Sequence, residues 1–168
     1  MPRFIAILII AASIIAGCSE GEVLDKPTIT EVEALARVEH LIKGAAAAIK
    51  PEPKLDLYRP SLNSNGCPDS AGGDSGNRMM VSRSYYLRGI PQERLAEAAM
   101  QVKHYWERQG HYIEGASANG LNISGRSRPD GFLLSLDATD SDNGVVLGIG
   151  ATSPCVWRNG TPEPSSTG

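Results

Sequence analysis

Two stretches of the chain repeat their apolar residues every three or four positions. In residues 28–50 the stripe consists of Ile29, Val32, Leu35, Val38, Ile42, Ala45 and Ile49. In residues 91–109 it consists of Leu95, Ala98, Ala99, Val102 and Trp106. This spacing is typical of amphipathic helices that pack one face against a core. The pattern therefore predicts two helices, over 28–50 and 91–109.

The ends of these helices carry capping residues. Either Thr28 with Glu31 or Thr30 with Glu33 has the spacing of a capping box, in which side chains satisfy the free backbone N–H groups of the first turn. Gly110 follows the second helix, where a residue with positive φ commonly ends a helix.

Apolar and polar residues alternate in five further segments, which we expect to be strands. These segments are 79–89, 111–118, 121–127, 132–138 and 145–151. Asn119-Gly120, Pro129-Asp130-Gly131 and Asn143-Gly144 lie between the last four. Asn-Gly between two strand-like segments is typical of a type I′ hairpin turn. The pattern predicts an antiparallel meander in the second half of the chain.

Residues 51–77 have no periodic pattern. They contain four prolines, at positions 51, 53, 60 and 68, and a run rich in Gly, Ser and Asp at 71–77. We therefore expect an irregular loop, although loops of this length are uncommon in compact domains.

The predicted order is helix, strand, helix and then four strands. Two amphipathic helices need an apolar sheet face to cover, so the simplest architecture is a two-layer α+β sandwich. In this fold both helices cover one face of an antiparallel sheet and the other face is open to solvent. We expect a single domain over residues 28–158 and a disordered tail, rich in Pro, Ser and Thr, over 159–168.

The first 18 residues have the character of a processing segment. Arg3 is followed by an almost wholly apolar run over residues 4–16, which is shorter than the ~20 apolar residues that a membrane-spanning helix needs. The run ends in Ile15-Ala16-Gly17-Cys18. This sequence resembles the lipobox of bacterial lipoproteins, in which an aliphatic residue and two small residues precede an obligatory cysteine.

The resemblance implies a signal peptide over residues 1–17, cleavage before Cys18, and acyl chains on that cysteine and on its new amino group. Two or more acyl chains give a stable anchor. The mature protein is then expected on the extracytoplasmic side of the cell membrane, with residues 18–27 as a tether. Two alternatives remain open, a secretory signal in which Cys18 is incidental and an uncleaved signal anchor.

The remaining cysteines fit this location. With Cys18 carrying lipid, Cys67 and Cys155 are left, and an even number of cysteines in an extracytoplasmic protein indicates a disulfide. Two free buried thiols are the alternative. The layout also resembles that of small actinobacterial lipoproteins of the LppA-like group, which share a lipobox, a cysteine in a Gly/Pro-rich loop, a strand-helix-meander core and a second cysteine near the end. That resemblance implies no known activity.

The charge of the chain excludes one class of partner. It carries 16 basic and 19 acidic residues, a net charge of −3, and no run of Lys or Arg. Nucleic acid is therefore not an expected partner.

Two short motifs match known catalytic sequences only in part. Gly73-Asp74-Ser75-Gly76 matches the tetrapeptide around the nucleophile of chymotrypsin-like proteases, but these residues are also common in loops. Ser141-Asp142-Asn143 matches one element of class A β-lactamases, whose other motifs the chain lacks. A loop and a hairpin turn explain both sequences, so no catalytic residue is assigned from them.

Two groups of ionisable residues are candidates for metal or acid–base sites. Asp137, Asp140 and Asp142 are close in sequence, but they lack the glycine and glutamate positions of an EF-hand loop. His104 and Glu107 share a side of the second helix, and His111 follows its predicted end. Solvated surface residues are the simpler interpretation of both groups, and we expect no metal and no cofactor.

The open face of the sheet is the best candidate for a binding site. The alternation places Tyr86, Arg88, Asn122, Ser124 and Arg126 on this face. Tyr and Arg are frequent in binding sites, and Gly148 and Gly150 leave room for a ligand.

The resulting hypothesis is a membrane-anchored, non-enzymatic envelope protein that binds a protein, glycan or lipid through this face. One alternative is a small envelope hydrolase, for which His104, Glu107 and Asp137 are the candidate residues. The other is a lipid carrier with an apolar cavity between helices and sheet.

Overall fold

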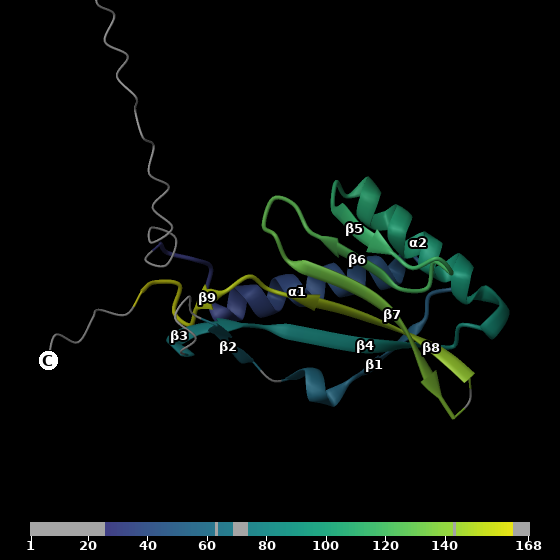
Figure 1. Ribbon diagram of the computed structural model, residues 1–168, viewed down its shortest axis with the longest axis horizontal. Coiled ribbons are helices and arrows are strands. Elements are labelled where there is room, and N and C mark those ends of the chain that lie inside the picture. The colour runs from purple at the N-terminus through teal and green to yellow at the C-terminus, as the bar shows by residue number, and fades with distance from the viewer. Residues whose placement is uncertain (1–25, 63, 69–73, 143, 163–168) are drawn as a thin grey trace, which may run out of the picture.

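The computed structural model describes residues 26–62, 64–68, 74–142 and 144–162. Two helices cover one face of a six-stranded antiparallel sheet, and a smaller three-stranded sheet adjoins the start of the first helix (Figure 1). The predicted α+β sandwich with its antiparallel sheet is therefore confirmed. Within the described ranges, no helix combines the length and apolar character needed to cross a membrane.

The elements follow one another in this order: α1 (Glu31–Ala47), β1 (Lys54–Leu57), the 3-10 helix η2 (Arg59–Leu62), β2 (Asn65–Pro68), β3 (Asp74–Met80), β4 (Ser82–Arg88), the 3-10 helix η3 (Gln92–Arg94), α2 (Leu95–Arg108), β5 (Tyr112–Ala116), β6 (Ile123–Arg126), β7 (Leu133–Ser141), β8 (Gly144–Thr152) and β9 (Val156–Trp157). The large sheet has the order β1-β4-β8-β7-β6-β5, and the small sheet has the order β2-β3-β9.

Helix α1 begins with the second of the two predicted capping boxes. The Thr30 hydroxyl accepts a hydrogen bond from the Glu33 N–H at 3.2 Å, and the Glu33 carboxylate accepts one from the Thr30 N–H at 2.8 Å. Two of the four free N–H groups of the first turn are thereby satisfied. After α2, Gly110 has a φ of 77°, as expected of the residue that ends a helix.

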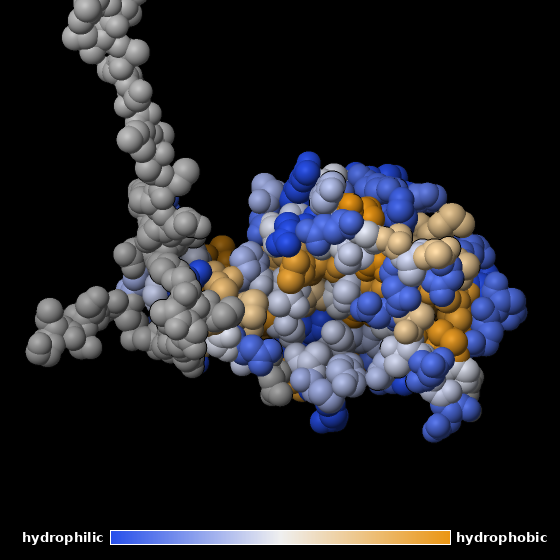
Figure 2. Space-filling model, in the orientation of Figure 1, coloured by the Kyte–Doolittle hydropathy of each residue, from blue (hydrophilic) through white to orange (hydrophobic). Residues whose placement is uncertain are grey.

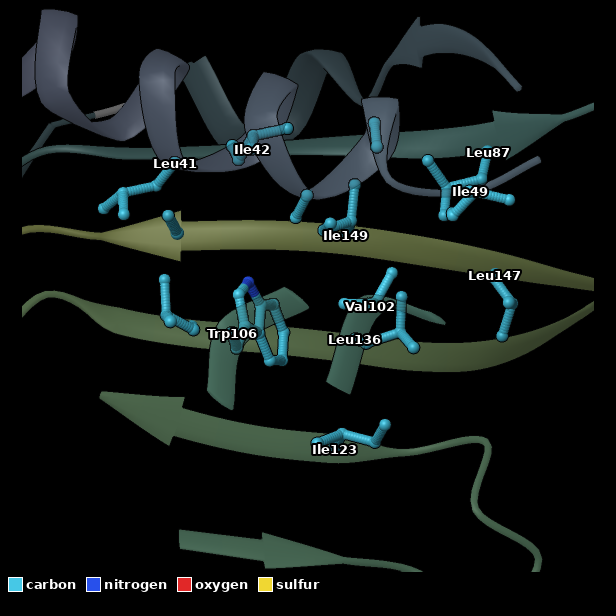
Figure 3. Packing of buried hydrophobic residues seen from close by; sticks show 14 of the residues in the cluster. Leu41, Ile42, Ile49, Leu87, Val102, Trp106, Ile123, Leu136, Leu147 and Ile149 are labelled. Carbon is cyan, nitrogen blue, oxygen red and sulfur yellow. The ribbon is translucent and has the colours of Figure 1, made fainter. Parts of the chain in front are cut away.

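The main core fills the space between the two helices and the large sheet. Figure 3 shows the two helices side by side over the sheet, with Leu41 and Ile42 on α1 and Val102 and Trp106 on α2. The largest fully buried side chains include Trp106, Phe132, Ile42, Leu87, Leu136, Leu147 and Ile149. Burying one such side chain contributes about 1.5–3 kcal/mol relative to leaving it in water.

The expected loop over 51–77 is wrong for most of its length. The segment contains β1, η2, β2 and the first half of β3, while residues 63 and 69–73 lie outside the described part of the chain. Prolines were the misleading signal. Pro60 lies in a 3-10 turn and Pro68 ends a strand, and both positions tolerate the missing N–H.

The single strand expected over 79–89 is also wrong, because it is two strands in two different sheets. β3 pairs with β2 and β9, whereas β4 pairs with β1 and β8. The change of partner takes place at Val81, whose N–H donates to the Ser153 hydroxyl at 2.9 Å and whose carbonyl accepts from the Ser153 N–H at 2.9 Å.

The four-strand meander is confirmed, since β5, β6, β7 and β8 are consecutive neighbours in the large sheet. The Asn119-Gly120 turn is not of type I′, which needs positive φ at both central residues. Only Gly120 has it, at 69°. Ser117 and Asn122 close a four-residue loop instead, and the Asn119 side chain accepts from the Leu121 N–H at 3.1 Å.

At the last hairpin, Gly144 already pairs with Ser141 as part of β8, so Gly144 is not a central turn residue. Asn143 lies outside the described residues. On the other side of the strand, the Gln92 side-chain amide donates to the Val145 carbonyl at 2.7 Å and accepts from the Val145 N–H at 3.1 Å. A side chain therefore makes the two hydrogen bonds that a neighbouring strand makes elsewhere along β8.

The Cys67–Cys155 disulfide is present and lies within the small sheet. Cys67 belongs to β2, Cys155 directly precedes β9, and their Cα atoms are 6.0 Å apart. Met79 of β3 and Val156 of β9 form a second, smaller cluster of buried residues with Ala34 and Val81.

The described domain extends slightly beyond the expected limits of 28 and 158. The Trp157 indole N–H donates to the Lys26 carbonyl at 3.2 Å, and the Thr28 N–H donates to the Gly160 carbonyl at 2.8 Å. The two ends of the domain are thus bonded to each other. The expected signal peptide, Cys18 and the last six residues of the expected tail lie outside the described residues.

Candidate functional site

The open face of the large sheet has glycines at its centre. In Figure 1 the helices run behind the strands, so this view presents the open face. Gly148 and Gly150 of β8 lie between β4 and β7, where Gly148 is flanked by Tyr86 and Asp137. In the next row, Gly150 is flanked by Ser84 and Ser135. Because neither glycine has a side chain, the sheet has a low floor along β8.

Three adjoining hollows lie on this face, two along β8 and one beside them over β5 and β6, and together we call them the open-face groove. The central hollow, about 270 Å³, is lined by Tyr58, Ser84, Tyr86, Ser135, Asp137, Thr139, Gly148 and Gly150, among others. A second hollow of about 190 Å³ shares Ser135 and Gly150 with it, and a third of about 340 Å³ shares Asp137. Together they fall within the ~300–1,000 Å³ of typical ligand sites.

Gly148 and Gly150 differ in how much space their neighbours leave for a side chain. A Cβ on Gly150 would lie 2.8 Å from the Ser84 hydroxyl oxygen and 3.1 Å from that of Ser135, so a side chain there meets its neighbours. A Cβ on Gly148 would meet only backbone oxygens, at 3.7 and 3.9 Å. Gly148 is also not among the glycines with positive φ. Neither backbone geometry nor crowding by the described residues therefore explains the glycine at 148.

Aromatic rings form one wall of the groove. Tyr58, between β1 and η2, meets Tyr86 of β4 edge to face, with ring centroids 5.6 Å apart. The Arg88 guanidinium lies 4.7 Å from the centroid of the Tyr86 ring, and its Nε donates to Asp56 at 2.9 Å. These contacts hold Tyr86 in place, while Tyr58 remains 41% exposed.

The middle of this face is only weakly polar. Figure 2 shows pale and orange residues across the centre and blue residues mainly at the rim. Asp137 is the only charged residue among the described residues that line the three hollows.

Of the five residues predicted for this face, three line the groove and two lie at its ends. Tyr86 and Ser124 line it, and so does Asn122, whose side-chain carbonyl accepts from the Ala138 N–H at 2.9 Å. Arg88 stacks on Tyr86 instead. Arg126 donates to Glu114 of the edge strand β5 at 2.9 Å.

Sequence reasoning left several lining residues out of the predicted set. Ser84, Ser135 and Asp137 were already on the polar side of the alternation, so grouping by strand neighbours would have found them once the sheet order was known. Thr139 follows the same alternation. Tyr58 carried no signal, because it fell within the expected loop.

The residues named for a hydrolase are not brought together. His104 and Glu107 lie on α2, which covers the helix side, whereas Asp137 lies on the open side of the sheet. Glu107 forms an ion pair with Lys103, and the pKa of its carboxyl is lowered chiefly by that hydrogen bond. His111 instead accepts a hydrogen bond from the Arg128 N–H at 3.3 Å, and burial lowers the pKa of its imidazole.

The aspartates considered for calcium are also separated. Asp137 and Asp140 occupy odd and even positions of β7, which point to opposite faces of the sheet. Within the described part of the chain, no three His, Cys, Asp or Glu residues are grouped as a metal site would need.

Of the two partial catalytic motifs, only Ser141-Asp142 has side chains within the described part of the chain. Ser141 donates its hydroxyl to the Gly144 carbonyl at 2.6 Å and so belongs to the hairpin. Residues 74–76 have the backbone of β3, and Gly73 lies outside the described residues.

The lipid-carrier hypothesis needs an apolar cavity between helices and sheet. The hollow there, lined by Ile49, Ile90 and Ala98 among others, holds about 10 Å³, which is about the space of one water molecule. An acyl chain does not fit in it.

The marked electrostatic interactions lie on the helix side rather than in the groove. Burial and a 2.7 Å hydrogen bond to Glu39 of α1 raise the pKa of Tyr85 to about 12. Burial also raises the pKa of Asp130, but hydrogen bonds from Arg37 and Ser127 outweigh it and leave this pKa below its usual value. These groups fix α1 and the β6–β7 turn to the sheet.

Comparison with known proteins adds no family to this description. No protein-family model, curated protein or solved structure matches the chain.

Proposed function

We propose that this protein is a lipid-anchored, extracytoplasmic envelope protein that binds a ligand or partner through the open-face groove and has no catalytic role. The partner is a protein or an envelope molecule such as a glycan. The observation that carries the proposal is the set of three adjoining hollows on the face of the sheet opposite the helices, two of them lined by Gly150 and one of these also by Gly148.

The membrane attachment follows from Ile15-Ala16-Gly17-Cys18 at the end of a short apolar run. A diacylglyceryl group on Cys18 and an acyl chain on the new amino terminus hold the domain at the membrane surface. The disulfide suits an oxidising compartment outside the cytoplasm. An anchored binding domain gains local concentration near partners in the same envelope.

Intact mass spectrometry of the protein from its native membrane tests the anchor. We expect a chain that begins at Cys18 and carries the added mass of a diacylglyceryl group and one acyl chain. A chain beginning at Cys18 without lipid mass would overturn the anchor, and Cys18→Ser should release the protein from membranes.

Photo-crosslinking in native membranes tests the groove. A photoreactive residue replaces exposed Ser124, which lines the groove, and in a matched variant it replaces exposed Glu97, which lies on α2 behind the sheet. We expect an adduct at position 124 that position 97 does not give. Equal labelling at both positions, or none at 124, would remove the groove as the binding surface.

A further inference from the structure

We infer that the open-face groove binds a neutral oligosaccharide. This inference rests on the proposed function and names the chemical class of its ligand. Four features of the groove carry it: its charge, its unused hydrogen-bonding groups, its aromatic wall and the glycine at 148.

The charge of the groove fits an uncharged ligand. Asp137 is the only Asp, Glu, Lys, Arg or His among the described residues that line the hollows. Arg88 and Arg126, the nearest predicted cations, are paired with Asp56 and Glu114 outside these linings. Phosphate and other anionic groups therefore find no cation here, and one carboxylate is too little for a cationic ligand.

The lining side chains have hydrogen-bonding capacity that the fold does not use. The hydroxyls of Ser84, Ser124, Ser135 and Thr139 and the carboxylate of Asp137 have no hydrogen-bond partner among the described residues. Hydroxyls both donate and accept, and a carboxylate only accepts. A ligand covered with hydroxyl groups satisfies both kinds of group at once.

These hydroxyls are arranged in a row across the strands. Ser84, Ser135 and Ser124 lie on β4, β7 and β6 at matching register positions, with Gly150 between the first two. Neighbouring strands are about 4.8 Å apart, which is close to the length of one sugar unit in an extended oligosaccharide. Successive sugars can therefore meet successive strands.

The aromatic wall supplies an apolar surface for the ring C–H groups of a sugar. Tyr86 is held by Arg88 and by edge contact with Tyr58, and Tyr58 is the more exposed of the two rings. An amphipathic ring beside hydroxyl groups suits a ligand that has both apolar and polar edges.

Gly148 is the most specific observation. Glycine inside a strand costs stability relative to residues with side chains, and it often marks a site where a ligand comes close to the backbone. No crowding and no positive φ requires it here. Its role is therefore to keep the centre of the groove open.

The proposal is for binding without cleavage. Glycoside hydrolysis generally uses two carboxyl groups on either side of the bond, about 5–10 Å apart. Among the described lining residues Asp137 supplies the only one.

The test uses the full lipidated chain in a detergent with a zwitterionic headgroup, because sugar-based detergents would compete. The probes are cello-, malto-, manno- and chito-oligosaccharides of one to six units. Isothermal titration calorimetry and saturation-transfer NMR measure their binding. We expect at least one series to bind. If the affinity keeps rising as the oligosaccharide lengthens to several sugar units, the natural ligand is part of a polymer. If the affinity stops rising after one or two sugar units, the natural ligand is a glycolipid headgroup.

Variants locate the binding. Gly148→Leu fills the groove and should weaken binding at least about tenfold. Tyr58→Ala should weaken it severalfold, whereas Tyr58→Phe keeps the ring and should bind like wild type. Ala96→Leu adds a leucine at an exposed position on α2 and should change nothing. Thermal melting of each variant verifies folding.

The outcomes separate this inference from the proposed function. If no oligosaccharide binds while position 124 still crosslinks to a protein, the inference is wrong and the groove remains a binding surface. If sugars bind equally to wild type and to a folded Gly148→Leu variant, they bind elsewhere, and the inference is wrong as well. If neither sugar binding nor a specific adduct occurs, both proposals are wrong.

Discussion

The large and the small sheet are held together in different ways. Between the large sheet and the helices lies a continuous core that includes Trp106, Phe132 and Leu136. The small sheet has a cluster of four buried residues, Ala34, Met79, Val81 and Val156, and adds the Cys67–Cys155 disulfide. Where apolar burial is extensive the chain needs no covalent link, and where it is slight a cross-link complements it.

The difference matters because the small sheet lies where the chain enters and leaves the domain. Lys26 and Gly160 both bond to segments at this end, close to β9. Local opening begins where few apolar contacts hold a region. The disulfide thus secures the end of the fold that its own core secures least.

The largest expected effect comes from a cavity in the main core. Leu136→Ala should lower the free energy of unfolding by about 3–5 kcal/mol, since the Leu136 side chain is fully buried among rigid neighbours. Met79→Ala in the small cluster should cost about 2 kcal/mol, the low end of the usual range, because only a few buried residues surround it there. Urea unfolding measures both, and equal losses would contradict the comparison.

Loss of the disulfide is expected to cost somewhat less than the core cavity. Cys67→Ser or Cys155→Ser should lower stability by about 2–4 kcal/mol, because the bond closes a long loop in the unfolded chain, with a sequence separation of 88 between its cysteines. Hydrogen exchange should speed up in β2, β3 and β9 before it does in β7 and β8. The double variant is the control and should match either single one. Two single variants that melt like wild type would refute the claim.

Helix α1 packs against both regions. Removing its N-terminal cap should therefore destabilise both of them, by less than the changes above. Ala34 belongs to the small cluster and Val38 to the main core, one turn apart. Thr30→Ala removes the capping box and should cost about 1 kcal/mol in thermal or urea unfolding. Thr30→Ser keeps the hydroxyl and should retain most of that stability. If Ser and Ala behaved alike, the hydrogen bond would not be the cause.

The smallest effect is a pH dependence at the same cap. Hydrogen bonds from the Thr30 N–H and hydroxyl lower the pKa of Glu33 below its ordinary value of 4.5. A lowered pKa means that the stabilising contribution is present above pH 4.5 and is lost as pH falls through the folded-state pKa. Carboxyl NMR titration should show Glu33 returning to its ordinary pKa in Thr30→Ala. An unchanged titration in that variant would contradict the assignment.

Local periodicity was enough to predict the helices, the meander and the side of the sheet on which each residue lies. Tyr86, Ser124, Gly148 and Gly150 were placed on the open face by alternation alone. Alternation reports which face a residue takes, but it carries no information about which strand lies beside it. The switch from the small to the large sheet at Val81 could therefore not be predicted, since the alternation of apolar and polar residues continues across it without a break.

Part of the candidate site escaped prediction for a related reason. Tyr58 reaches the groove only because β1 pairs with β4, a contact between segments about 30 residues apart. Prolines on either side of β1 had suggested a loop. Asp137 was on the predicted polar face, but its proximity to Tyr86 depends on β8 lying between their strands.

The position of Gln92 bears on whether molecules of this protein can associate through the edge of the large sheet. Its side-chain amide occupies the backbone groups of Val145, beyond the point where β4 stops pairing with β8. An unpaired stretch of strand with apolar residues such as Val145 and Val146 is a template for adding a strand from another molecule. Because the Gln92 side chain already bonds to these groups, they are not available for pairing with a strand of another molecule.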